Sequence, residues 1–191
     1  QGEVIVSSGH GFSGMERLKL VQILEARARE LGVSVHHNVD IATPADIPAA
    51  DLVVGAEGIK SMIRREFADA FQPHIEVRPN RYVWFGTSKP FDAFTFYFKE
   101  NEHGLWRGHC YSYAPGKSTF IVEGTEESWR RAGMENYGEK ETMAYCAALF
   151  ADELGEHRLI GNESKWRSFP VIRNVNYHHG NIVLIGDSLH T

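Results

Sequence analysis

The sequence has few cysteines, no long apolar run and no excess of positive charge. Two of its 191 residues are cysteine, and the spacing of Cys110 and Cys146 suggests neither a metal site nor a redox pair. We therefore expect two free thiols and a cytoplasmic location, where thiols stay reduced. No apolar run approaches the roughly 20 residues that a membrane-spanning helix needs. A net charge of −5 gives no reason to expect a nucleic-acid partner.

Two functional patterns are also missing. Gly9–Gly14 (GHGFSG) contains G-x-G, but the third glycine is at the wrong offset for a dinucleotide fingerprint and no adequate strand precedes it. No Ser/His/Asp or Cys/His arrangement is visible, so the catalytic residues are unknown at this stage. Val33–His37 alternates like a strand, which would point His36 and His37 to opposite faces, and we expect no metal there.

The limits of the sequence are unusual. It starts at Gln1, and it stops at Thr191 directly after a strand pattern and a helix start. A natural domain seldom ends at such a point, because the last strand would lie uncovered. We therefore expect an internal piece of a longer protein.

Asp51–Arg64 (DLVVGAEGIKSMIR) predicts a buried strand at Leu52–Val54, a glycine-bracketed acid, and a helix that opens near Ser61. Gly55 and Gly58 allow a backbone to approach a ligand closely or to take a positive φ. The start of a helix offers free N–H groups to a phosphate. The alternative is an ordinary strand–turn–helix connection without a ligand.

A second stretch, Asn181–Thr191 (NIVLIGDSLHT), predicts a strand of a parallel sheet at Ile182–Ile185. Gly186 and Asp187 follow at its carboxyl end, where open α/β sheets bind their ligands. An aspartate at that edge can accept hydrogen bonds from the hydroxyls of a ribose or ribityl chain.

Near the start of the chain, Met15–Leu31 carries apolar residues such as Leu20 and Leu24 at helical spacing. It predicts an amphipathic helix that Gly32 ends. Arg17 lies in its first turn, either as a solvated surface charge or as a cation near a cofactor phosphate.

The middle of the chain is rich in aromatic residues, since 11 of the 22 fall between Tyr82 and Tyr113. Phe94, Phe96 and Phe98 alternate with Thr95 and Tyr97, which predicts an antiparallel strand with one aromatic face. The predicted neighbours of this strand are Arg81–Thr87 and Gly104–Tyr113, with Ser118–Glu123 as a fourth strand.

The aromatic face has two interpretations. Its rings pack for stability, or they roof a cavity for a flat aromatic ligand. Under the second interpretation Phe96, His109 and Tyr111 are candidate substrate contacts. Beyond the sheet we expect helices from Thr125 and over Glu141–Leu154, then a strand at Lys165–Phe169 that Pro170 ends or bends.

Taken together, these stretches resemble the flavoprotein aromatic hydroxylases of the para-hydroxybenzoate hydroxylase type. The helix with Arg17 resembles their R-x-x-L-x-x-x-L segment, and Asp51–Arg64 resembles D-x-x-x-G-A-D-G-x-x-S-x-V-R. Gly186–His190 resembles G-D-A-A-H. Gly9–Arg17 and Tyr82–Gly104 look most like hydroxylases of aromatic CoA thioesters, which act on 2-aminobenzoyl-CoA and salicyloyl-CoA.

The resemblance implies an α/β (α+β) fold: part of a three-layer ββα, Rossmann-like FAD-binding domain with an inserted antiparallel-sheet substrate domain. It implies FAD-binding residues over 1–66 and 166–191, and a substrate domain over 67–165. The implied cofactor contacts are Arg17, Gly55, Glu57, Gly58, Gly186 and Asp187. Because the G-x-G-x-x-G turn is missing, we expect these 191 residues alone to bind FAD poorly.

The resemblance also implies the chemistry. NAD(P)H would reduce FAD, the reduced flavin would form a C4a-hydroperoxide with O₂, and an electron-rich ring would attack its distal oxygen. Two alternatives are open: another flavin enzyme on the same scaffold, such as a halogenase or a reductase, and a non-catalytic fragment without flavin. The sequence departs from the family at Glu57, which replaces an aspartate, and at Ser188-Leu189, which replaces Ala-Ala. Glu57 and Leu189 favour the second alternative.

Overall fold

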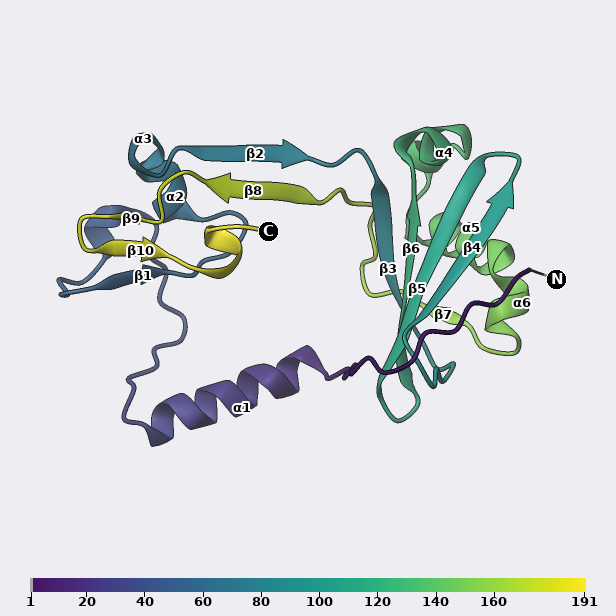
Figure 1. The fold of residues 1–191 in the computed structure, drawn as a ribbon, viewed down its shortest axis with the longest axis horizontal. Coiled ribbons are helices and arrows are strands. Elements are labelled where there is room, and N and C mark those ends of the chain that lie inside the picture. Colours follow the sequence, from purple (N-terminus) through teal and green to yellow (C-terminus); the bar gives the residue numbers. More distant parts are fainter. Residues whose placement is uncertain (1) are drawn as a thin grey trace. The chain divides into compact units, whose positions relative to one another are not determined.

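A computed structural model describes residues 2–191 and divides them into two compact units (Figure 1). The first unit comprises the chain up to Ser34 together with Asn80–Arg167, and the second comprises Val35–Pro79 and Ser168–Thr191. Each unit therefore joins segments that are distant in sequence. The expected domain limits at 66/67 and 165/166 stay a prediction about the function of these segments.

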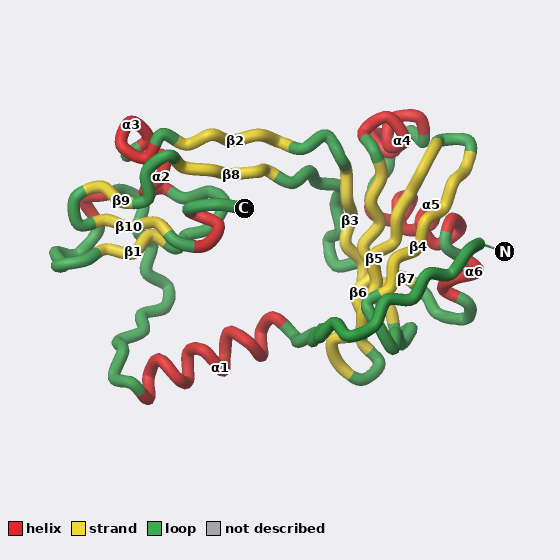
Figure 2. Tube along the Cα trace, in the orientation of Figure 1, coloured by secondary structure: helices red, strands yellow, loops and turns green. Residues whose placement is uncertain are grey.

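The first unit is built on a five-stranded antiparallel sheet of order β4-β5-β6-β3-β7 (Figure 2). Its strands are β3 (Arg81–Thr87), β4 (Thr95–Asn101), β5 (Gly104–Ala114), β6 (Lys117–Gly124) and β7 (Leu159–Ile160). The four predicted strands are confirmed. Their predicted order is wrong in one respect, because β3 pairs with β6 and β7 and not with β4.

One face of this sheet forms the main hydrophobic core. Val83 and Phe85 of β3 and Phe120 of β6 are almost completely buried there. The face is covered by α4 (Glu126–Arg131), α5 (Glu139–Leu149), α6 (Ala151–Leu154) and the short helix η2 (Met134–Asn136). Alternation along each strand explains the arrangement, since every second side chain points toward these helices.

The opposite face of the sheet carries the aromatic row of β4. Phe96 and Phe98 are 49% and 63% exposed, whereas Tyr97 between them packs against the core. The predicted aromatic face is confirmed, but its interpretation as core packing is wrong for these phenylalanines.

The N-terminal helix α1 (Arg17–Glu30) lies within the predicted range. Gly32 has φ of +81°, and the N–H groups of Gly32 and Val33 donate to the carbonyls of Arg29 and Ala28. This pair of bonds is a Schellman motif, as the glycine suggested. The helix buries none of its residues. The strand predicted for residues 33–37 is wrong, because that segment pairs with no strand.

The second unit contains a three-stranded sheet in which β1 (Val53–Gly55) runs parallel to β10 (Ile182–Leu184), followed by β9 (His178–His179). Two short helices, α2 (Met62–Glu66) and α3 (Ala68–Phe71), pack against it through a small core. A two-stranded ribbon, β2 (Pro73–Val77) with β8 (Pro170–Asn174), and the single turns η1 (Pro44–Asp46) and η3 (Gly186–Ser188) complete the unit.

The strand predicted at Lys165–Phe169 is wrong. Arg167 forms only an isolated bridge with Tyr82, and β8 begins at Pro170. Proline has no N–H to donate to a sheet, so it is tolerated at the first position of a strand. Here the residue opens the strand instead of ending it.

Both cysteines are free and buried. Burial raises the pKa of both thiols, which keeps them protonated and unreactive. Among the described residues, no helix is both long and apolar enough to cross a bilayer. The same residues hold no group of three or more His, Cys, Asp or Glu side chains that could bind a metal ion.

Candidate functional site

The two glycine-containing loops of the second unit meet at one edge of its sheet. Because β1 and β10 are parallel neighbours, with Gly55 opposite Leu184, their carboxyl ends lie side by side. We call the loops that follow, residues 55–61 and 186–188, the junction loops. Ser188 Oγ donates to Glu57 Oε2 at 3.0 Å and accepts from the Gly58 N–H at 2.8 Å. The junction therefore joins segments about 130 positions apart.

The carboxylate of Glu57 is bonded on several sides. Besides Ser188, it accepts from the Ile63 N–H at 2.9 Å and from Ser61 Oγ at 3.0 Å. Ser61 in turn caps α2, as predicted, by accepting from the Arg64 N–H at 3.0 Å. Burial alone would raise the pKa of Glu57, but the bonds from Ile63, Ser188 and Ser61 favour the anion, so the pKa lies below its usual value.

Arg64 is the main link between the junction loops. Its side chain is almost completely buried, and Nη1 donates to the carbonyls of Ser188 at 2.7 Å and Asp187 at 3.3 Å. Nη2 donates to the carbonyl of Ile59. One guanidinium thus satisfies acceptors on both loops and fixes their separation.

The glycines of the junction have different roles. Gly58 and Gly186 have positive φ values, +81° and +55°, and a side chain added at either would meet open space. A side chain at Gly55 would instead come within 2.9 Å of Leu184 Cδ2 and 3.1 Å of Ile63 Cδ1. Packing within the unit is therefore sufficient to explain Gly55, while Gly58 and Gly186 leave room beside the backbone.

Asp187 is exposed at this edge, and no described residue donates a hydrogen bond to its carboxylate. Leu189, one position beyond the buried Ser188, packs against the small core and so points away from the open side of the junction. A free carboxylate beside unobstructed glycine backbone, at the carboxyl ends of parallel strands, fits the hydroxyl-bearing part of a nucleotide cofactor.

A second candidate region is the exposed face of the five-stranded sheet, which we call the open face. Its rings form a continuous row, with centroids 4.8 Å apart for Phe94 and Phe96 and 4.9 Å apart for Phe96 and His109. Tyr111 stacks on Phe94 at 5.4 Å, and Phe12 from the N-terminal segment contacts both. Phe96, His109 and Tyr111, the predicted substrate contacts, therefore lie together on one surface.

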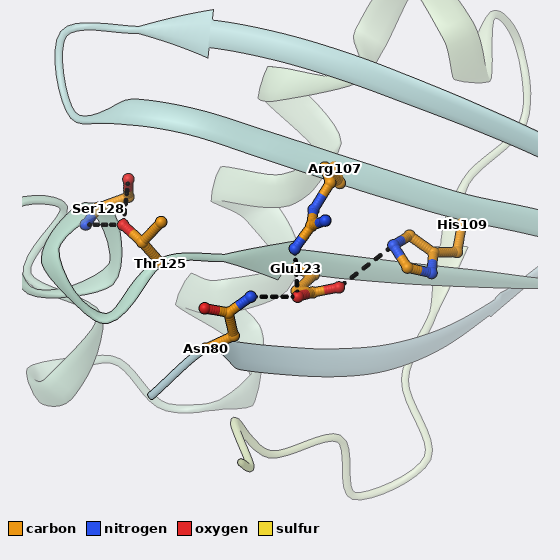
Figure 3. A network of polar contacts seen from close by, with 6 residues as sticks. All are labelled: Asn80, Arg107, His109, Glu123, Thr125 and Ser128. Atoms are coloured by element: carbon orange, nitrogen blue, oxygen red, sulfur yellow. Dashed lines mark hydrogen bonds and ion pairs between the residues drawn. The ribbon is translucent and has the colours of Figure 1, made fainter. Parts of the chain in front are cut away.

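The open face also carries a polar network centred on Glu123 of β6 (Figure 3). Its Oε1 accepts from Asn80 Nδ2 at 2.7 Å and from Arg107 Nη2, and its Oε2 lies 3.3 Å from His109 Nε2. Burial lowers the pKa of His109 below its usual value, Glu123 opposes this shift, and Arg107 adds to it. The imidazole is therefore neutral near pH 7.

Beside the aromatic row runs a groove of about 870 Å³ within the first unit. Aromatic side chains line it together with basic ones, and Arg17, Lys165 and Arg167 have no acidic partner among the described residues. The fourth cation, Lys117, pairs with Glu16. The full set of aromatic and basic lining residues is Tyr82, Trp84, Phe85, Tyr111, Tyr113, Arg17, Lys117, Lys165 and Arg167. Such a lining suits a flat ligand that carries negative charge.

The predicted site residues thus fall into two groups. Gly55, Glu57, Gly58, Gly186 and Asp187 surround the junction in the second unit, while Arg17 and the three substrate candidates belong to the first. Their contacts with a cofactor or substrate stay predictions.

Several residues were missed from sequence. Ser188 was noted only as a replacement for alanine, and the buried Arg64 only as part of a motif. Glu123 gave no signal, because its contact with His109 depends on the pairing of β5 with β6. The basic residues at 165 and 167 alternate, which hinted that both point to the same face.

Comparison with known proteins identifies relatives over nearly the whole chain. A salicyloyl-CoA 5-hydroxylase of Streptomyces sp is 36% identical in an alignment that covers 96% of this chain and 37% of that protein. A protodeoxyviolaceinate monooxygenase of Chromobacterium violaceum is 33% identical and matches 97% of this chain and 50% of that protein. A 3-hydroxy-4-methyl-anthranilyl-[aryl-carrier protein] 5-monooxygenase of Streptosporangium sibiricum is 34% identical and matches 94% of this chain and 47% of that protein.

Over nearly its whole length the chain is similar to parts of three monooxygenases of aromatic substrates. No family model matches it. The chain spans between 37% and 50% of the lengths of these curated relatives.

Solved structures support the fold of the chain. A 2-methyl-3-hydroxypyridine-5-carboxylic acid oxygenase matches 92% of this chain and 51% of its own, with a TM-score of 0.66 and 17% identity. An aklavinone-11 hydroxylase solved with FAD and aklavinone matches 92% of this chain and 36% of its own, with a TM-score of 0.62 and 17% identity. A flavin-dependent halogenase matches 92% of this chain and 35% of its own, with a TM-score of 0.64 and 16% identity. Identities this low establish a shared mixed α+β fold and do not decide the reaction.

Proposed function

We propose that the gene product carrying this chain is an FAD-dependent monooxygenase that hydroxylates an aromatic acyl thioester of coenzyme A with NAD(P)H and O₂. The contact between the junction loops carries the cofactor part of this proposal, because it brings two family motifs to the same edge of one sheet. The family relationship supports the reaction class, and the open face supports an aromatic substrate.

The proposed cofactor contacts of the second unit lie around the junction. Asp187 would accept hydrogen bonds from hydroxyls of the cofactor, while Gly58 and Gly186 would let its chain pass close to the backbone. Arg64 and Glu57 hold the loops in place from the buried side. Arg17, at the start of α1, is a proposed cation for a phosphate. When bound, FAD supplies the redox chemistry that activates O₂.

The finer architecture follows the same proposal. Residues 1–66 and 166–191 would contribute to the FAD-binding domain, and residues 67–165 would form the substrate domain. The role of the sheet is then to bind and orient the aromatic ring and to exclude water from it.

The proposed substrate class rests on the groove. Lys165 and Arg167 offer two unpaired cations beside the aromatic row. Coenzyme A carries phosphates, and an aryl thioester carries a flat ring, so a single ligand would satisfy both parts of the surface. The name of the Streptomyces relative, a salicyloyl-CoA hydroxylase, supports the same class.

A halogenase is the second candidate, because a flavin-dependent halogenase shares the fold at a TM-score of 0.64. Dependence of product formation on chloride or bromide would favour it over the hydroxylase. Its sequence identity to this chain, 16%, is less than half that of the salicyloyl-CoA hydroxylase.

The test uses the purified gene product with NADH or NADPH, O₂ and a panel of salicyloyl-CoA, 2-aminobenzoyl-CoA and free salicylate. We expect thioester-dependent oxidation of the nicotinamide and a product that has gained one oxygen atom. Lys165→Ala should weaken binding of salicyloyl-CoA by roughly tenfold, the effect of one charge-assisted contact. Lys140→Ala, an exposed lysine on α5, is the matched control. Equal activity with free salicylate would contradict the thioester assignment.

A further inference from the structure

The network around Glu123 on the open face has no role in the proposed function as stated so far. The Glu123 side chain is only 14% exposed, and one of its oxygens, Oε1, receives both Asn80 and Arg107. These two donors come from outside β6 and hold the carboxylate from different directions. The other oxygen, Oε2, is left facing His109 (Figure 3).

This arrangement favours one tautomer of His109. Nε2 is buried and lies 3.3 Å from Glu123 Oε2, within ion-pair distance, but it has no hydrogen-bond partner among the described residues. A proton on this nitrogen is favoured because an unprotonated nitrogen and a carboxylate oxygen are both acceptors and repel each other at this distance. The lone pair of the neutral ring is therefore on Nδ1, to which no described residue donates.

The aromatic row also fixes the orientation of the histidine ring. Phe96 meets it edge to face, with centroids 4.9 Å apart and an interplanar angle of 64°. Arg107 and Glu123 are the charged groups that face the histidine, from β5 and β6. His109 is thus a neutral base held within a row of aromatic side chains.

We propose that Glu123 is a positioning residue that holds His109 as the proton acceptor for an ionisable O–H or N–H group on the aromatic ring bound at the open face. The inference rests on the proposed function, because it needs the aromatic ring to bind there. It adds a substrate requirement, namely that the ring carries such a group.

The proposed step is a single proton transfer. For a ring hydroxyl, the O–H bond breaks, its electron pair stays on oxygen, and a new N–H bond forms at His109 Nδ1. The resulting imidazolium faces the negative charge of Glu123, which favours its formation. The ionised oxygen donates electron density to the ring and makes its carbon a better nucleophile. The imidazolium then returns its proton to solvent, so no further reactant is needed.

The test measures the ionisation of a bound probe. Salicyloyl-CoA carries a ring hydroxyl, and the absorbance of the bound thioester reports the pH at which that hydroxyl loses its proton. Benzoyl-CoA lacks the hydroxyl and tests whether the surface still binds an aryl thioester. The variants are Glu123→Gln, Glu123→Asp and His109→Gln in the purified gene product. The control is Glu126→Gln on α4, which removes a carboxylate that pairs with Arg81 of β3 and with Arg130 of the same helix.

We expect Glu123→Gln and His109→Gln to raise the ionisation midpoint of bound salicyloyl-CoA by about one pH unit, a tenfold change in the equilibrium. Glu123→Asp should restore part of the shift, and Glu126→Gln should leave the midpoint unchanged. Glu123→Gln, Glu123→Asp and Glu126→Gln should bind benzoyl-CoA as the wild type does. If both thioesters bind and Glu123→Gln leaves the midpoint unchanged, the inference is overturned and the proposed function stands. If the wild type binds neither thioester, both are overturned.

Discussion

The hydroxyl of Ser188 donates a 3.0 Å hydrogen bond to the carboxylate of Glu57, which lies 131 positions earlier in the chain. These are two of the positions at which the sequence departs from the family motifs that it resembles, where aspartate and alanine are found. The longer acid and the added hydroxyl are therefore bonded to each other. Of the two departures that favoured a non-catalytic fragment, Glu57 is thus bonded within the junction, and Leu189 packs against the small core.

The first prediction concerns this pair. Glu57→Asp should shorten the acid beyond reach of Ser188, and Ser188→Ala should remove the donor. Each variant should lower the free energy of unfolding by about 1 kcal/mol. The double variant should lower it by less than the sum of the two single effects. Chemical denaturation of the four proteins measures the coupling. Strict additivity would show that the two side chains act independently.

The second prediction concerns Arg64. A lysine cannot reach three carbonyls with one planar group, so Arg64→Lys should lower the free energy of unfolding by about 2 kcal/mol. The neighbouring Arg65 has a side chain that is 66% exposed, and Arg65→Lys should stay within about 0.5 kcal/mol of the wild type. A similar effect for both variants would refute the assignment of Arg64 as the link between the junction loops.

The meeting of the junction loops was predictable because neighbouring parallel strands of one sheet end at the same edge. The bounds of β3 were predictable because Tyr82–Phe85 is a run of aromatic and β-branched residues, which favour strands. Pairing order was not predictable, since the partner of β3 is fixed by the whole sheet and not by its own residues. The network of Glu123 was missed for the same reason.

Local sequence patterns also gave two wrong predictions, because they do not show how a segment packs in the fold. Residues 33–37 follow the alternating pattern of a strand, but none of them is part of a strand in the structure. The phenylalanines of β4 looked like core residues by hydrophobicity alone, yet the helices cover the other face of the sheet. An apolar row that the fold leaves exposed is a better guide to function than to packing.

The third prediction separates the two faces of the sheet. Phe85 is buried among the helices, and Phe85→Ala should lower the free energy of unfolding by about 3–5 kcal/mol. Phe96 is half exposed, so Phe96→Ala should cost about 1 kcal/mol or less but weaken binding of salicyloyl-CoA. Calorimetry gives both quantities. Full thioester affinity in Phe96→Ala would argue that the aromatic row does not contact the ligand.

The fourth prediction concerns pH. The pKa of Glu57 is lower in the folded protein than its ordinary value of 4.5, so ionised Glu57 stabilises the fold above that pH. This contribution is lost as the pH falls through the lower, folded-state pKa. The difference in unfolding free energy between the wild type and Glu57→Gln should therefore be constant well above pH 4.5 and shrink as the pH falls below 4.5. A difference that grows on acidification would reverse the assigned direction of the shift.

The most direct measurement is a titration of FAD into the gene product after removal of any bound flavin, for the wild type, Asp187→Ala and Asp69→Ala. Asp69 is an exposed acid on α3 and serves as the control. The account predicts that the wild type and Asp69→Ala bind FAD with equal affinity, and that Asp187→Ala binds it at least about tenfold more weakly with an unchanged melting temperature. Equal affinity in all three proteins, or no flavin bound by the wild type, would contradict it.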